Sequence, residues 1–348
     1  MVRAPRLTAL LLALLPLPIA ATNASDMVER FDAAVVGMSP EEGTAVAGQP
    51  RLRRSGADLG VERLLNIDVE FPGKIKGKMY RGFLHGEAAV FTRSAGHLDV
   101  TVMRNGDTEV VSFNAPESPG LPTESISADA DQPSSRSRRS VNPGHFEDPA
   151  AYNLRFYFVK HDDLIDHAAT SLHARYVAWW LADMAGNVLP AEPLRANYLE
   201  HLPWITSIAY GDSRSLDIFE RTLKALDDFY GFDMERTYKN KYVLLTARPP
   251  MPGTTGVAFE GGNEAIASIV GRSRIVAHEV GHMLGATHRQ AETRGWWGCE
   301  TNMLAISSGR RDDCLEYTAA NQRAMRSYMR HGPDSLAPRR MADAPPAQ

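Results

Sequence analysis

Three histidines at fixed spacing constrain the fold of this chain more than any other feature of its 348 residues. His278, His282 and His288 lie in the run His-Glu-Val-Gly-His-Met-Leu-Gly-Ala-Thr-His. The residues just before His278 include no glycine or proline, which favours a helix, and residues four apart share one helix face. Gly285 can adopt the left-handed conformation that ends a helix. The motif therefore predicts a helix, a tight turn and a returning segment that together gather three imidazoles.

This arrangement is typical of a catalytic zinc site. Three protein ligands, here His278, His282 and His288, leave the fourth position of a tetrahedral ion open to water. Glu279 would lie beside the ion without binding it, and can accept a proton from that water. The alternative is a helix whose histidines are ordinary core or surface residues. We expect one catalytic zinc ion; calcium is a further candidate cofactor that no motif indicates.

The motif resembles that of the metzincin clan of zinc endopeptidases, in which a methionine turn follows the third histidine. The candidate turn is Cys299-Glu300-Thr301-Asn302-Met303-Leu304. The resemblance implies that Met303 lies beneath the metal as an apolar base for the imidazoles, whereas the alternative is an ordinary core methionine. It also implies that Leu304–Ser308 help to line a mainly apolar specificity pocket.

The resemblance further implies an α/β (α+β) fold. A metzincin catalytic domain has a twisted, mixed five-stranded sheet with backing helices and an active-site helix, and a small β-rich pro-domain would precede it here. By similarity to reprolysins, one strand would be an antiparallel edge that binds an extended substrate through its backbone. That strand consists of Gly256, Val257, Ala258 and Phe259.

Short apolar runs predict the remaining elements of the two regions. In the first region, strands are expected at 64–69, 87–92, 97–102 and 110–113. In the second, strands are expected at 154–159, 194–199, 207–210, 242–247, 256–261 and 265–270. Helices are expected at 164–184, at 213–231, around the histidine motif and at 316–331.

The beginning of the chain indicates export, and export in turn bears on its cysteines. Residues 1–24 have the charged start, short apolar run and small residues of a signal peptide, and the apolar run is too short to span a bilayer. Cys299 and Cys314 are the chain's two cysteines, and in an oxidising compartment they predict one disulfide. Two ligands of a metal site are the alternative. The net charge of -4, spread without runs, argues against nucleic-acid or anionic-membrane partners.

A proline- and serine-rich segment at 114–144 divides the chain. It contains Arg136, Arg138 and Arg139 followed by a serine, a pattern that proprotein convertases and trypsin-like proteases cut. We therefore predict a propeptide at 25–139, an activating protease that acts at Arg139, a protease domain at 140–332 and a disordered tail at 333–348. A solvated charge cluster is the alternative for the arginines. Because the propeptide region has no cysteine, a carboxylate such as Asp107, a histidine or simple steric covering would keep the enzyme latent.

The predicted function is a secreted zinc endopeptidase made as a zymogen, acting on protein or peptide substrates. The sequence departs from two patterns of known metzincin subfamilies. Arg289 stands where reprolysins usually carry aspartate, and no tyrosine follows Met303 closely as it does in astacins and serralysins. The segments 179–184 and 297–303 resemble the metzincin-type A subunit of bacterial AB-type toxins, which assembles with a carrier pentamer. A toxin subunit with a carrier ring as partner is therefore the alternative, and an inactive binding module is a third.

Overall fold

The computed structural model describes residues 24–38, 58–114, 153–230, 237–295, 298–305, 311–333 and 341–342. The predicted signal peptide, the arginines at 136, 138 and 139, and most of the tail lie outside these described residues. So do Ile306–Ser308 of the expected specificity pocket. Within the described part, no helix combines the length and apolar character needed to cross a bilayer.

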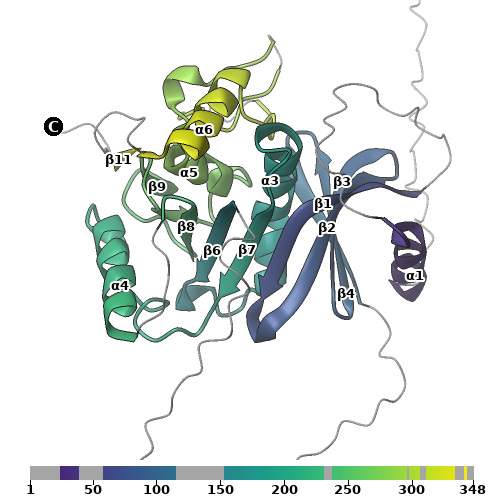
Figure 1. Cartoon of the computed structure of the whole chain (residues 1–348), viewed down its shortest axis with the longest axis horizontal. Helices are drawn as coiled ribbons and strands as arrows, with labels where there is room; N and C mark the ends of the chain where they lie inside the picture. Colours follow the sequence, from purple (N-terminus) through teal and green to yellow (C-terminus); the bar gives the residue numbers. More distant parts are fainter. Residues whose placement is uncertain are drawn as a thin grey trace, which may run out of the picture.

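The described residues form one mixed sheet of eleven strands at the centre of the molecule, in the order β11-β9-β10-β8-β6-β7-β1-β2-β3-β4-β5 (Figure 1). The second region contributes β6 (Leu154–Lys160), β7 (Leu194–Leu199), β8 (Asn240–Thr246), β9 (Gly256–Phe259) and β10 (Glu264–Ser268). Strands β6, β7, β8 and β10 are parallel to their neighbours within this group, and β9 is antiparallel to β10. These five strands are adjacent, but the expected five-stranded sheet is not confirmed because the sheet continues beyond both ends of the group.

The sheet continues on one side because the first region adds its own strands. These are β1 (Leu59–Phe71), β2 (Ile75–Leu84), β3 (Glu87–Ser94), β4 (His97–Arg104) and β5 (Asp107–Asn114), with the helix α1 (Ala24–Val35) packed against them. β1 pairs in parallel with β7, from Ile67 opposite Leu194 to Glu70 opposite Asn197. Alternate residues of β1, including Ile67, are buried in the same apolar core as Phe156 of β6. The expected separate pro-domain is therefore joined to the rest of the fold by both hydrogen bonds and core packing.

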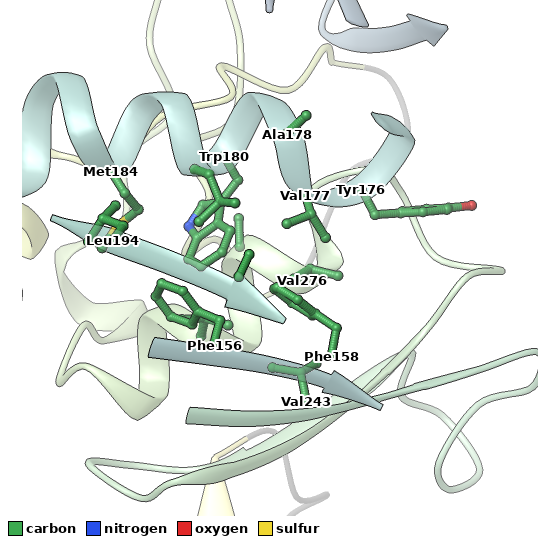
Figure 2. Packing of buried hydrophobic residues seen from close by; sticks show 14 of the residues in the cluster. Phe156, Phe158, Tyr176, Val177, Ala178, Trp180, Met184, Leu194, Val243 and Val276 are labelled. Atoms are coloured by element: carbon green, nitrogen blue, oxygen red, sulfur yellow. The ribbon is translucent and has the colours of Figure 1, made fainter. Parts of the chain in front are cut away.

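Helices cover both faces of the second region's strands, whose residues are buried almost throughout. One long helix is made of α2 (Ala169–Leu172), the π-helical turn η4 (His173–Val177), α3 (Ala178–Asp183) and the π-helical turn η5 (Met184–Val188). It packs on the same face as α5 (Ile275–Met283), where Trp180 and Val276 meet Phe156 and Phe158 (Figure 2). The helix α4 (Ser215–Tyr230) covers the opposite face.

Two segments differ from the sequence-based expectations. Residues 207–210 do not form a strand, because Ile208 packs its side chain into the core beside α4 while its carbonyl faces the His161 ring, 3.0 Å from Nε2, instead of a neighbouring strand. Strand β2 was not expected, since Lys76, Lys78 and two glycines interrupt its apolar alternation. At the C-terminal end, α6 (Ala319–His331) is followed by the short strand β11 (Met341–Ala342), which lies within the tail that was expected to be disordered.

Candidate metal centre

The helix α5 and the turn after it bring the three histidines together. The Nε2 atoms of His278 and His282 are 3.3 Å apart, and they lie 3.1 and 2.9 Å from Nε2 of His288. Gly285 has a φ of 83°, the left-handed conformation in which a side chain is strained, and it lets the chain turn back towards His288. Among the described residues, these three histidines form the group that could hold a metal ion.

Backbone carbonyls fix the orientation of two of the imidazoles. Nδ1 of His278 lies 2.6 Å from the carbonyl oxygen of Asn302, and Nδ1 of His282 lies 3.2 Å from that of Ala286. Because a carbonyl oxygen can only accept, the proton of each neutral ring belongs on Nδ1. Nε2 then presents a lone pair, which is the form of histidine that binds metals.

The spacing of these lone pairs suits a metal ion. Without a cation between them, the Nε2 lone pairs of His278 and His282 would repel each other and that of His288. A tetrahedral zinc ion with Zn–N bonds of 2.0–2.1 Å separates its ligands by about 3.3–3.4 Å. The observed separations of 2.9–3.3 Å approach this value, so the three residues fit a zinc ion.

Glu279 lies next to the histidines on α5 and is 1% exposed. Its carboxylate packs against the first residue of β9: a Cβ built on Gly256 would lie 2.3 Å from Oε1. The absence of a side chain at Gly256 therefore makes room for this carboxylate. In this way β9 and α5 place the proposed base and the sheet edge in direct contact.

Met303 lies under α5 at the position of its only internal glycine. A Cβ built on Gly281 would lie 2.3 Å from the sulfur of Met303, which is completely buried. The helix can therefore approach the methionine closely only because residue 281 has no side chain. Met303 thus packs against α5 at Gly281, between the two histidines of that helix in sequence; its role as an apolar base beneath the imidazoles stays a prediction.

A buried ion network holds the loop that carries Met303. Arg274, at the start of α5, donates to the carbonyl of Thr301 over 2.9 Å, and its guanidinium lies 3.4 Å from Glu300 and 3.3 Å from Asp313. Arg272 adds a 2.8 Å ion pair to Asp313. Burial holds the pKa of Asp313 above its ordinary value, although the neighbouring Arg274 and Arg272 act in the opposite direction. Sequence reasoning missed this network because its members are ordinary charged residues far apart in the chain.

A disulfide joins Cys299 and Cys314, as the sequence predicts. The disulfide closes the loop that carries Met303. Next to it, Glu300 and Asp313 pair as an isolated β-bridge. From the other side, the hydroxyl of Tyr317 donates to the carbonyl of Ala277 and accepts from Nε1 of Trp180 over 2.8 Å. Tyr317 thus ties α3 to the centre of α5, a contact that no sequence pattern indicated.

The first region also supports the long helix behind α5. In a π-helical turn the backbone bonds shift to i→i+5, and such turns frequently occur at functional sites. Around η4, the hydroxyls of Thr101 and Thr108 donate to the carbonyls of Ala174 and Arg175 over 2.6 and 2.9 Å. Within it, Nε2 of His173 lies 3.0 Å from the hydroxyl of Thr92. Asp107, the candidate latency residue, instead accepts from the amide of Thr108, and in the described part of the chain no carboxylate joins the histidine group.

The expected substrate-binding edge lies at β9, and its outer side is partly occupied. Ala258 and Phe259 pair with Ala342 and Met341 of β11. Of the other residues discussed from the sequence, Arg289 is exposed after the third histidine, and Trp297, the first residue of the segment 297–303, lies outside the described residues.

Comparison with known proteins gives little beyond these observations. No protein-family model matches the sequence, and no curated protein matches it. Among solved structures, metalloproteinase-II from Bacteroides fragilis is similar, with a TM-score of 0.47 and 16% sequence identity, over 76% of this chain and 86% of that one.

Proposed function

We propose that this chain is a secreted, zinc-dependent endopeptidase made as a zymogen. The observation that carries the proposal is the convergence of three Nε2 atoms, together with the buried carboxylate of Glu279, which follows His278 on α5 and contacts Gly256 at the sheet edge. A structural metal site would use all positions of the ion, whereas three ligands leave one for a reactant.

His278, His282 and His288 would hold the zinc ion. When bound, zinc acts as a Lewis acid that makes water a good nucleophile near neutral pH and stabilises developing negative charge. Glu279 accepts the proton of the attacking water and delivers it to the leaving amine. Burial of Glu279 keeps bulk water away from this transfer.

The backbone of β9 would orient the substrate. An extended peptide can add to an exposed strand through main-chain hydrogen bonds, which tolerate many side chains. Because Gly256 touches Glu279, a peptide on β9 would place one of its carbonyls near both the base and the histidines.

Export and activation belong to the same proposal. The signal sequence at 1–24 would direct the chain out of the cell, and the Cys299–Cys314 disulfide suits an oxidising compartment. Cleavage after Arg139 would activate the zymogen. Since β1 and β7 share the sheet, we propose that the two fragments stay associated after this cut.

The test is cleavage of a broad peptide library by three preparations. These are the full-length chain, the chain cut after Arg139, and the cut Glu279→Ala variant as a matched control that keeps all three histidines. We expect activity in the cut, Glu279-intact form alone. A chelator should abolish this activity and zinc should restore it.

Metal content separates the possible failures. The Glu279→Ala protein should bind one zinc ion per chain and remain inactive, because the variant removes the base and leaves the ligands. If all forms bind zinc and none cleaves any peptide, the protease proposal is wrong. A partner-dependent toxin subunit or a binding module would then explain the site better.

A further inference from the structure

The outer edge of β9 is paired with the C-terminal end of the same chain. β9 pairs with β10 on one side, and on the other Phe259 and Ala258 pair with Met341 and Ala342 in antiparallel orientation. Figure 1 shows β11 beside β9 at the end of the sheet. The strand that would bind substrate thus already has a peptide partner.

The strand β11 occupies the part of the β9 edge that continues towards Gly256 and Glu279. β9 runs from Gly256, which touches Glu279, to Phe259. Because β11 is antiparallel to β9, the chain from Met341 to Ala342 runs towards Gly256. Each outward N–H and C=O of a strand serves one ladder partner at a time, so β11 and a substrate cannot use Ala258 and Phe259 together.

The helix before β11 is fixed close to this edge. The hydroxyl of Tyr328, in α6, donates to the carbonyl of Gly261, two residues beyond β9, over 2.9 Å. The buried amine of Lys241 donates to the same hydroxyl over 2.8 Å and to the carbonyl of Met283 over 3.0 Å. The end of α6 is thereby held against both the turn after β9 and the end of α5.

A short connection from an anchored helix favours self-binding. Residues 332–340 join α6 to β11. Covalent attachment through so few residues gives β11 an effective concentration at β9 in roughly the millimolar range, so even weak strand pairing competes with free peptides. A two-residue strand makes few hydrogen bonds, so displacement by a longer substrate remains easy.

We propose that β11 is an autoinhibitory strand, which competes with substrates for the edge of β9. This inference rests on the proposed peptidase function for its consequence, but the strand pairing itself can be measured without activity. The strand lowers the affinity for substrate and leaves the chemical step unchanged.

The experiment compares four forms of the chain, each cut after Arg139. They are the intact sequence, a chain ending at Arg340, a Met341→Pro/Ala342→Pro variant and a matched Met341→Val/Ala342→Val variant. Proline lacks the N–H that the ladder needs, whereas valine keeps it and favours strands. We expect truncation and the proline pair to lower KM for an extended peptide on the order of tenfold with unchanged kcat. This is the effect of losing the few hydrogen bonds between β9 and β11, each worth about 1 kcal/mol net. The valine pair should keep the KM of the intact sequence or raise it.

Hydrogen–deuterium exchange tests the contact independently of catalysis. In the zinc-loaded Glu279→Ala background, the amides of residues 257–259 that face away from β10 should exchange faster in the truncated and proline forms than in the intact and valine forms. Equal exchange in all four forms, with equal melting temperatures, would overturn the proposal. If exchange changes while no form cleaves peptide, the strand contact stands and the peptidase assignment fails.

Discussion

Gly256→Ala is the substitution that most directly tests how β9 and Glu279 work together. The new Cβ would lie 2.3 Å from Oε1 and 2.7 Å from Cδ and Cγ of Glu279. Ordinary contacts are 3.4–4 Å, so the carboxylate has to move by roughly 1 Å. A misplacement of about 1 Å in a catalytic group can cost on the order of 100-fold in rate. We therefore expect kcat/KM to fall about 100-fold in the variant cut after Arg139.

Stability and metal binding should change far less than activity. Crowding by the new methyl group should lower the free energy of unfolding by about 1–3 kcal/mol. Replacing a strand glycine by alanine should raise it by roughly 0.5–1 kcal/mol, because alanine loses less backbone entropy on folding. The three histidines are untouched, so zinc content should remain one ion per chain. Gly77→Ala in β2 is the matched control, since its Cβ meets no atom closer than 3.3 Å.

The assay measures peptide cleavage, zinc content and melting temperature for both variants. Full activity of Gly256→Ala with normal zinc content would refute the reasoning, because the carboxylate would then not need its observed position. Loss of zinc together with activity would show that the clash spreads into α5 instead of remaining at Glu279.

Three further predictions concern stability and the association of the two regions. Burial lowers the pKa of His173 to about 3, so only the unfolded chain takes up this proton near pH 6.5. The His173 contribution to the free energy of unfolding should therefore fall by about 1.4 kcal/mol per pH unit between pH 6.5 and about 3, and urea titrations should show a smaller slope in His173→Leu. Burial raises the pKa of Asp183 to about 7, so stability is lost as pH rises from about 4 to about 7. Asp183→Asn should then raise the free energy of unfolding at pH 8 by at most about 4 kcal/mol, and no gain by urea titration would contradict this. Thr101→Val and Thr108→Val should each weaken the association of the fragments cut at Arg139 by about 1 kcal/mol, measured by their dissociation in gel filtration; unchanged dissociation would contradict the role of these hydroxyls.

The sequence predicts those parts of the molecule that depend on neighbouring residues. The spacing of His278 and His282 places both rings on one helix face, and the glycine at 285 allows the turn to His288, so the group could be anticipated. Strands such as β6 and β8 follow from local apolar runs. These features need no knowledge of what lies far away in the chain.

Long-range pairings had no such signal. The parallel pairing of β1 with β7 depends on which strand edge is free, and the backbone groups involved are the same in every residue. The ion network of Arg274, Glu300 and Asp313 likewise arises from residues that each look like a solvated surface charge. The sequence predicts a strand at Ile208 because apolar alternation does not distinguish a strand from a core-packed loop.

The continuous sheet makes the molecule a split protein if the chain is cut after Arg139. The larger fragment, expressed alone, would present the bare edge of β7 and the apolar side chains that β1 covers, and such an edge invites pairing with other chains. The two halves therefore have to be synthesised as one chain. The β1–β5 meander is made first, and its free edge at β1 pairs only after β7 has been synthesised. An affinity tag on either half should then retrieve both.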